Sequence, residues 1–401
     1  MNRLTLMLLA AFAGLLSTDA AAADKPLKVY ILVGQSNMQG HAQVRTFEHI
    51  SMDPRTAPML KEMQNADGNP RVCEDVWISS IGHDGTETEK HGRLTAGYGA
   101  AGGSEPKIGP ELTFGIYMQK LVDQPILIIK TAWGGKSINT DFRPPSAGPY
   151  EFNEQQLDNF RKQKRDVDEA KQQKAEATGR YYRLMMTHVQ KVLSDIKRVY
   201  PNYDAKAGYE LAGFVWFQGW NDMVDRGTYP TRDQPGGYDQ YSKVMAHFIR
   251  DVRKDLSAPE MPFVIGVLGV GGPVEKYGPS QQRYKSVHTN FRNAMAAPAS
   301  LPEFKGNVAA VRTENYWDLQ LSEFASRWDK VRGKSRELNR NKELSREERE
   351  KQLDAFKAEL FTPKELDIYQ KGTSNAAYHY LGSAKILGQI GKAFAEAIDG
   401  M

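Results

Sequence analysis

Cysteine is almost absent from this chain. Cys73 is the only cysteine in 401 residues, so no intramolecular disulfide can form and core packing must hold the fold together. Cys73 lies among apolar neighbours in RVCEDVWI with no histidine close by, which favours a buried structural thiol over a nucleophile. We therefore expect neither a disulfide scaffold nor a cysteine hydrolase.

Strong net charge is absent as well. The 53 Lys and Arg residues nearly balance 49 Asp and Glu residues, and a net charge of +4 gives no electrostatic case for nucleic acid as a partner. His41, His83 and His91 fall in predicted loops at irregular spacing, which is no metal-ligand pattern, so no metal or other cofactor is expected. His188 and His247 lie in amphipathic helices and are expected to be structural.

Long apolar runs are missing after the N-terminus. Residues 1–23 have Arg3, an apolar run from Leu4 to Leu16 and the small residues Ala20–Ala23. This pattern predicts a signal peptide cleaved after Ala23, because the run is shorter than the ~20 apolar residues of a spanning helix. We expect a secreted or periplasmic protein with no membrane association after cleavage.

Five short apolar runs predict buried strands, and amphipathic helical patterns separate them. The runs do not alternate with polar residues, which is typical of strands covered on both faces. This order predicts a three-layer α/β/α domain around a parallel sheet of about five strands. The predicted strands are Val29–Val33, Ile126–Thr131, Phe214–Gln218, Phe263–Leu268 and Val308–Val311.

Two segments depart from this pattern. Residues 151–180 and 326–357 are dense in charge and poor in apolar residues, and the capping-box spacing recurs at Ser345–Glu348 and Thr362–Glu365. We expect solvated helical insertions on a single domain spanning residues 24–401; a partner-docking arm is the alternative. The stretch 39–107 is expected to be loop-rich and to wall the site.

Four short motifs follow predicted strands or precede the last helix. Ligands bind beyond the C-terminal ends of parallel strands, so we expect the motifs to meet at one edge of the sheet. The motifs are GQSNM with Ser36, the double glycine Gly134–Gly135, WFQGWND with Gln218, and SNAAYHYLGSAK with His379.

These residue types are the parts of a serine esterase. A serine such as Ser36 is common at the polar end of a strand and by itself indicates no catalysis, but with His379 as base it becomes a candidate nucleophile. The backbone N–H groups of Ser36 and of Gly134 or Gly135, with the Gln218 amide, are candidate oxyanion donors. Glycine suits this place because it lets the backbone approach the substrate.

The same motifs resemble a known family. GQSNM, the double glycine, WFQG and a late His, in this order, are similar to the sialate O-acetylesterase-like branch of the SGNH hydrolases, which includes the acetylxylan esterases of carbohydrate esterase family 6. The resemblance runs from about Lys28 to the C-terminus without the charged insertions. It implies a flavodoxin-like fold, no metal, and hydrolysis of acetyl esters on sugars, with Ser36, Gly134 or Gly135, Gln218 and His379 in the roles above.

The acid of the catalytic triad is missing from both expected places. Family members usually carry Glu directly after the QG or Asp shortly before the His, where this chain has Trp220 and Ala376, with Asn375 one residue further back. Asp222 is the closest substitute in sequence, and Glu111 is a weaker one. A Ser–His dyad held by a backbone carbonyl is also adequate, because the third member only positions the imidazole.

The sequence therefore predicts a secreted carbohydrate O-acetylesterase that acts through a serine acyl-enzyme on an acetylated carbohydrate. The missing carboxylates leave open a catalytically degenerate glycan-binding protein on the same scaffold, and a lipase-like esterase is a third hypothesis. Aromatic and polar residues near the motifs are candidate sugar contacts: Trp133, Arg143, Trp220, Asn221 and Tyr378.

Overall fold

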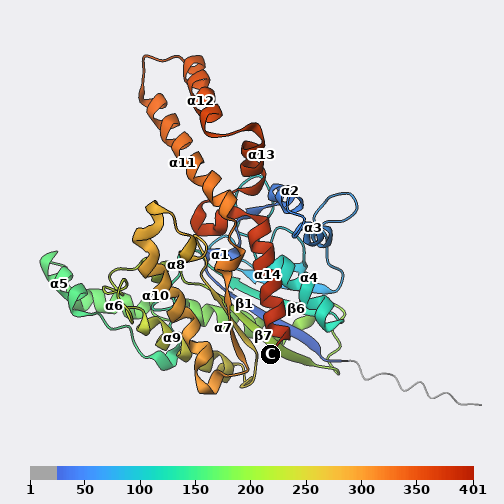
Figure 1. Cartoon of the computed structure of the whole chain (residues 1–401). Coiled ribbons are helices and arrows are strands. Elements are labelled where there is room, and N and C mark those ends of the chain that lie inside the picture. Colours follow the sequence, from blue (N-terminus) through green and yellow to red (C-terminus); the bar gives the residue numbers. More distant parts are fainter. Residues whose placement is uncertain (1–24) are drawn as a thin grey trace, which may run out of the picture.

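A computed structural model describes residues 25–401, so the predicted signal peptide lies outside the described residues. A mostly parallel sheet of seven strands, in the order β4-β3-β6-β1-β7-β8-β9, forms the centre of the fold (Figure 1). All five expected strands are present and parallel: β1 (Leu27–Gly34), β6 (Ile126–Ala132), β7 (Tyr209–Phe217), β8 (Phe263–Val267) and β9 (Val308–Arg312).

The expectation of about five strands was too low. β3 (Val76–Ile81) pairs in parallel with β6, and β4 (Lys90–Arg93) pairs antiparallel with β3 at the edge. Both lie in the stretch expected to be loop-rich. The two serines of VWISSI interrupt the apolar run of β3, and KHGR in β4 carries no apolar residue, so neither strand has the usual hydrophobic pattern. A short second sheet pairs β2 (Ala42–Gln43) with β5 (Lys107–Ile108).

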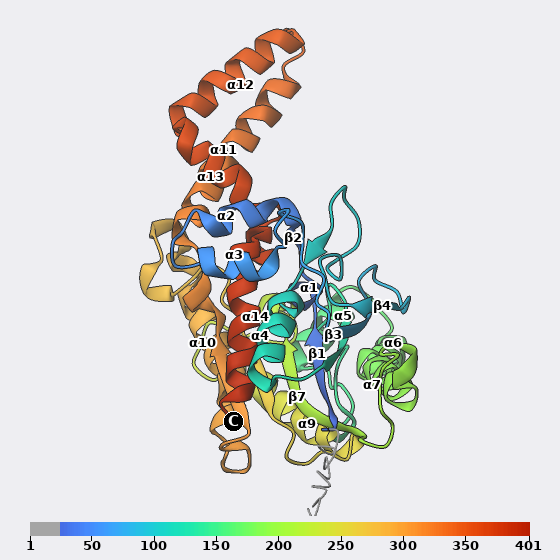
Figure 2. The same cartoon turned by 90° about the vertical axis from the view of Figure 1, so that its right-hand side faces the viewer.

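Helices cover both faces of the sheet (Figures 1 and 2). α4 (Glu111–Val122) and α14 (Ala384–Asp399) lie on one face, and α7 (Arg180–Ser194) and α9 (Asp239–Asp255) lie on the other. Along β7, Trp216 contacts Phe248 of α9 with ring centroids 4.4 Å apart, whereas Phe217 contacts Phe394 of α14 at 5.4 Å. Neighbouring residues of the strand are thus buried on opposite faces, which explains its unbroken apolar run.

Shorter helices complete the layers. Within residues 25–401, no helix combines the length and apolarity needed to cross a bilayer. The helices that complete the layers are α1 (Ser36–Gln39), α2 (Phe47–Ser51), α3 (Ala57–Met63), α8 (Trp220–Val224) and α10 (Lys285–Ala296).

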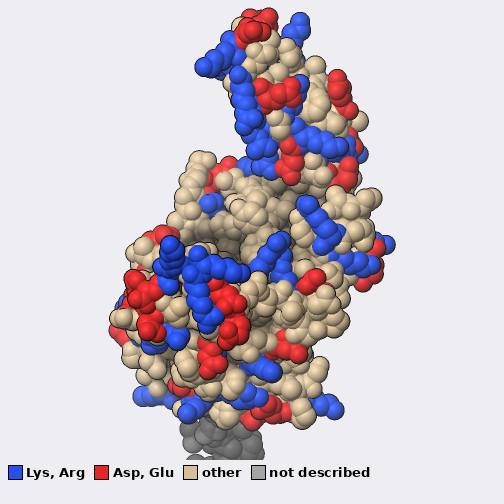
Figure 3. Space-filling model, turned by 90° about the vertical axis from the view of Figure 1, so that its left-hand side faces the viewer, with Lys and Arg blue, Asp and Glu red and all other residues tan. Residues whose placement is uncertain are grey.

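The charged segments are helical. Residues 151–180 contain α5 (Glu154–Lys162) and α6 (Val167–Ala177), and residues 326–357 lie within α11 (Leu319–Arg340) and α12 (Arg346–Leu360). With α13 (Pro363–Gly372), α11 and α12 form an arm that projects from the core, and Figure 3 shows acidic and basic side chains intermixed on it. Both expected capping boxes are confirmed, at the starts of α12 and α13. Phe324, Val331 and Phe361 form a separate small core inside the arm.

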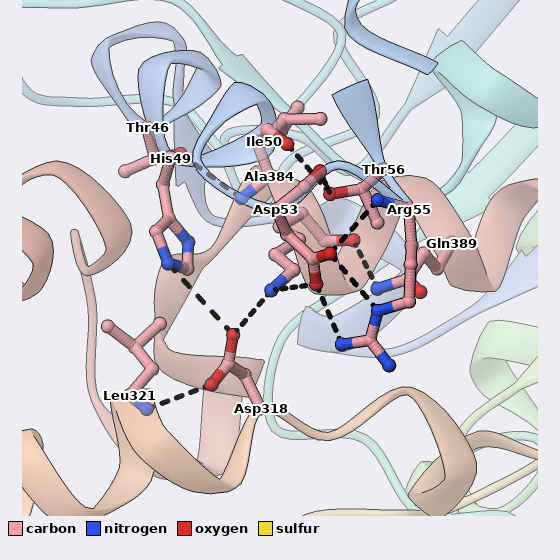
Figure 4. Close-up of polar contacts among 11 residues, drawn as sticks. Thr46, His49, Ile50, Asp53, Arg55, Thr56, Asp318, Leu321, Ala384 and Gln389 are labelled. Carbon is pink, nitrogen blue, oxygen red and sulfur yellow. Dashed lines mark hydrogen bonds and ion pairs between the residues drawn. The ribbon is translucent and has the colours of Figure 1, made fainter. Parts of the chain in front are cut away.

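Ion pairs join the arm to the core. Asp318, which caps the first turn of α11, binds Lys385 Nζ of α14 at 2.9 Å. The same Nζ lies 3.1 Å from Asp53 Oδ2, so one ammonium connects two carboxylates from distant parts of the chain. Figure 4 shows both carboxylates, with Arg55 beside Asp53. These side chains line a cavity of about 570 Å³ at the base of the arm.

A buried ion pair lies beneath α1. Lys130 of β6 and Glu111 of α4 have side chains 1% and 0% exposed, with Nζ 2.8 Å from Oε2. Nζ also donates to the carbonyl oxygens of Gln39 and Tyr98, each at 2.9 Å, so all three ammonium protons have acceptors. Burial lowers the pKa of Lys130, and the adjacent Glu111 carboxylate opposes that change. The ion pair thus holds the C-terminal end of α1 through the Gln39 carbonyl.

Replacing Lys130 should test how much this pair stabilises the fold. Lys130→Met leaves the buried Glu111 carboxylate without its cation, and we expect a loss of about 3–5 kcal/mol in the free energy of unfolding. Urea denaturation followed by circular dichroism measures it. Lys28→Met removes the cation of the exposed pair with Glu210 and should cost under about 1 kcal/mol. Equal losses in the two variants would contradict the prediction.

Candidate active site

The end of β1 places Ser36 against two neighbouring strands. β1 pairs with β6 and β7 as far as Gly34, and Ser36 then begins α1 with 8% of its surface exposed. A Cβ on Gly34 would lie 2.1 Å from Phe217 O, so only glycine permits this close approach of β7. The two strands therefore fix the backbone immediately before Ser36.

Of the two glycines after β6, Gly134 faces Ser36. A Cβ added to Gly134 would lie 3.9 Å from Ser36 Cβ and 3.1 Å from Gln39 Oε1, whereas a Cβ on Gly135 would meet nothing within 4 Å. Gly135 has a φ of 74° and supplies the turn. Gly134 is thus the glycine at the serine, and a larger residue there would crowd Gln39.

His379 lies in the 3-10 turn Ala377–Gly382, which contacts α1. Its Nδ1 lies 2.9 Å from Asn375 Oδ1, which also accepts the Ala376 N–H at 2.8 Å. Because an amide oxygen only accepts hydrogen bonds, Nδ1 carries the proton and Nε2 is the basic nitrogen. Burial, and then Lys107, lowers the pKa of His379 to about 4. The imidazole is therefore neutral at pH 7.

The turn is held by an anchor in the core. Tyr380 and Leu381, directly after His379, have φ values of 52° and 60°, a left-handed conformation that non-glycine residues seldom adopt. The Tyr380 ring is fully buried, and its hydroxyl lies 2.6 Å from Thr313 Oγ1 and accepts the Gly269 N–H at 2.8 Å. This anchor stabilises the strained backbone that carries His379.

A network of side-chain amides begins at Gln35, the residue before Ser36. Gln35 Oε1 accepts the Gly219 N–H at 3.1 Å and faces Gln218 Nε2 at 3.2 Å. Gln218 Nε2 also donates to Asp222 Oδ2 at 2.6 Å and to Lys136 O at 2.9 Å. Gln218 thus has three acceptors for its two N–H groups, so the structure commits it to the network and not to the oxyanion position expected from the sequence.

The structure does not bring Asp222 to His379. The Asp222 carboxylate is 1% exposed and accepts the N–H groups of Ile138 and Asn139, at 2.9 and 3.2 Å, besides the Gln218 amide. Burial raises the pKa of Asp222 to about 6 against the effect of its hydrogen-bond donors. Asp222 therefore anchors the loop after β6, and the group beside Nδ1 is the neutral amide of Asn375. Glu111, the other acid considered, is bound to Lys130.

Tyr378 lies beside His379, and Trp220 lies beside Tyr378. Tyr378 is 45% exposed, and its ring centroid lies 4.4 Å from that of His379 and 5.7 Å from that of Trp220. Asn221 lies below them, where its Oδ1 accepts a hydrogen bond from Gln35 Nε2 at 3.0 Å. An exposed aromatic flank therefore borders the imidazole.

Trp133 and Arg143, also expected to contact a sugar, lie in the interior. Trp133 is 1% exposed, and its indole N–H donates to Thr86 O at 3.2 Å. Arg143 is 6% exposed, and its guanidinium donates to the carbonyl oxygens of Gly148 and Ala147 at 2.8 and 2.9 Å. Both side chains hold the loops around the site.

Two other serines contact histidines. Ser79 Oγ lies 3.0 Å from His188 Nε2, but Ser79 is 0% exposed and no substrate can reach it. Ser146 Oγ lies 2.8 Å from His247 Nδ1 on the surface. Ser146 does not follow a strand of the sheet, so it lacks the convergence of strand ends seen at Ser36.

Sequence reasoning missed Gln35, Asn375 and His41 as parts of the site. Gln35 is adjacent to Ser36 within GQSNM, which was a usable signal for the amide network. Asn375 is four residues before His379, and a search limited to carboxylates passed over it. His41 looked like an ordinary loop residue, and no sequence pattern indicates that it would contact His379.

A family described as "Carbohydrate esterase, sialic acid-specific acetylesterase" matches residues 26–306. The chain belongs to this family. The match includes Ser36, Gly134 and Gln218 but ends before the arm and His379. Family membership supports a function of the carbohydrate acetylesterase type.

Solved structures with low identity are also similar, and no curated protein matches the chain. A protein of Arabidopsis thaliana has a TM-score of 0.38 and 16% identity, covering 72% of this chain and 86% of its own. A carbohydrate acetylesterase from Xanthomonas citri has a TM-score of 0.37 and 14% identity, covering 71% and 49%. The protein named NanS has a TM-score of 0.36 and 13% identity, covering 72% and 78%.

Asn375→Asp should raise the pKa of His379 from about 4 by about one to three units, because a carboxylate beside Nδ1 stabilises the imidazolium. Titration of the His379 Cε1 signal by NMR measures the change. Asn202→Asp introduces the same charge near Leu27, at the opposite end of β1, and should leave that pKa unchanged. An unshifted His379 in Asn375→Asp would show that the two side chains are not in contact.

Proposed function

We propose that the protein is an exported carbohydrate O-acetylesterase with the flavodoxin-like fold of the SGNH hydrolases, and that it hydrolyses acetyl esters of sugars through an acetyl-Ser36 intermediate. The observation that carries the proposal is the position of His379: its Nδ1 is occupied by Asn375 and its turn contacts the helix that begins at Ser36. Family membership supports the ester and the carbohydrate, and the signal-like N-terminus supports export.

In the proposed reaction, Ser36 Oγ attacks the acetyl carbon while its proton passes to His379 Nε2. The N–H groups of Ser36 and Gly134 stabilise the oxyanion. Collapse of the intermediate breaks the bond to the sugar oxygen, which takes the proton from His379 and leaves as an alcohol. Water then attacks the acetyl-Ser36 carbonyl and gives a proton to His379; the bond from the acetyl carbon to Ser36 Oγ breaks, Oγ takes that proton back, and the acetyl group leaves as acetic acid, which ionises to acetate.

The aromatic flank is the proposed sugar platform. Tyr378 exposes ring surface next to His379, with Trp220 beside it, where the leaving sugar oxygen must lie when it is protonated. Aromatic rings pack against the apolar faces of sugars while their hydroxyls stay hydrated. The two rings therefore orient the sugar, and the acetyl group points toward Ser36.

The competing proposal is a glycan-binding protein on the same scaffold, and the specific observation in its favour is Asn375. A neutral amide orients the imidazole but does not neutralise the imidazolium that forms during acyl transfer. This alternative predicts sugar binding at the aromatic flank with no acetate release.

Ser36→Ala should abolish acetate release from O-acetylated sugars. We expect kcat to fall about 10⁴-fold or more, because the nucleophile and base act as a unit. Ser146→Ala removes a surface hydroxyl that also contacts a histidine and should retain wild-type activity. Equal rates of acetate release in wild type and Ser36→Ala would refute the esterase proposal. Sugar binding without acetate release in both proteins would favour the glycan-binding protein. Butyrate esters, if hydrolysed faster than acetate esters, would indicate the lipase-like alternative.

The activity should persist to unusually low pH. The base is active only when Nε2 is unprotonated, so kcat/KM should rise through the His379 pKa of about 4 and be constant near neutrality. Initial rates measured between pH 3 and 8 test this. An acidic limb centred near 6.5 would show that the folded protein does not lower the His379 pKa.

A further inference from the structure

A second imidazole lies flat against the candidate base. The rings of His41 and His379 are stacked, with centroids 3.8 Å apart and planes 3° from parallel. His41 follows Gly40, the C-cap of α1, so it lies just beyond the short helix that begins at Ser36. The Nε2 atom of His41 is buried without a hydrogen-bond partner, so the stacking contact accounts for the position of the ring better than a polar contact does.

The backbone around this pair is tied together by Ser374. Ser374 Oγ accepts the Gln43 N–H at 3.1 Å and lies 3.1 Å from His41 O and 2.7 Å from Gly382 O. The His41 segment and the His379 turn are therefore joined through the Ser374 hydroxyl. This arrangement leaves the two imidazoles little freedom to separate.

Few charges act on the pair. After burial, His379 itself and then Lys107 and Lys130 lower the pKa of His41, whereas Lys107 alone adds to the effect of burial on the pKa of His379. Burial is the larger cause in each case, and it lowers the pKa of His41 to about 3. Asn375 and Ser374, which also contact this segment, have side chains that carry no charge.

We infer that His41 is a positioning residue for His379, holding the imidazole by its face where Asn375 holds it by one edge. The inference rests on the proposed function. A neutral acceptor such as Asn375 forms a weaker hydrogen bond with the ring than a carboxylate would. The stacked ring supplies a second constraint and excludes water from one face of the imidazole.

Three variants of His41 separate ring stacking from other roles. His41→Phe keeps a flat ring, His41→Gln fills a similar volume without a ring, and His41→Ala removes both. With a fully O-acetylated glucose as substrate, we expect kcat to fall about 10- to 100-fold in the Gln and Ala variants, with KM within about twofold. The Phe variant should stay within about threefold of wild type. Thermal melting shows whether each variant is folded.

The second readout does not need activity. In a Ser36→Ala background, NMR titration should give a His379 pKa at least one unit above the wild-type value in His41→Ala and His41→Gln, because water reaches the exposed face. His41→Phe should keep the low value. Unchanged kcat and pKa in the Ala and Gln variants, or a Phe variant as slow as Ala, would overturn the inference. If wild type releases no acetate, the proposed function fails while the titration still decides the role of His41.

Discussion

The Lys130 ammonium is the contact on which the site depends. It lies in the interior with Glu111 and donates to the carbonyl oxygens of Gln39 and Tyr98, so β6, α4, α1 and the loop before β5 meet at one charge. A buried cation is costly unless every proton has an acceptor, and here each one does. The same carbonyl of Gln39 ends the turn that begins at Ser36. A substitution of Lys130 or Glu111 would therefore disturb the single helical turn that begins at Ser36.

The base is positioned by a different part of the molecule. His379 follows the arm, and its turn is anchored through Tyr380 to Thr313 and Gly269 rather than to the strand ends that hold Ser36. The arm itself is tied to the core by Lys385 between Asp53 and Asp318. The family match ends at residue 306, so the proposed nucleophile lies inside the matched region and the proposed base outside it. The two halves of the site meet only because the C-terminal turn folds back against α1.

The fold followed from the sequence wherever burial on two faces leaves an unbroken apolar run, which is why all five runs are strands. It did not follow for β3, whose apolar run is interrupted by the buried Ser79 and Ser80, or for the edge strand β4, whose polar residues are typical of a loop. His379 comes to α1 through the turn before α14, but the approach of Gly134 to Ser36 was predictable because parallel strands end together. The partner of His379 Nδ1 was not, since a hydrogen bond between residues 375 and 379 depends on the strained turn at Tyr380 and Leu381. The burial of Trp133 and Arg143 was equally hidden, because aromatic and guanidinium groups suit both an open site and a loop interior.

A neutral hydrogen-bond partner for His379 changes which of the two proposed proton transfers is easier. With no carboxylate at Nδ1 and with burial lowering its pKa to about 4, His379 is a weak base toward Ser36 but, once protonated, a strong acid. The leaving group from a sugar ester is an alkoxide, which needs a proton before it can depart. An imidazolium that readily gives up its proton favours that step, while the first proton transfer is correspondingly harder. The stacked His41 affects the same two proton transfers, because its ring faces the His379 imidazolium that forms between them. The exchange of a carboxylate for Asn375 is therefore compatible with catalysis in which protonation of the sugar oxygen matters more than activation of the serine.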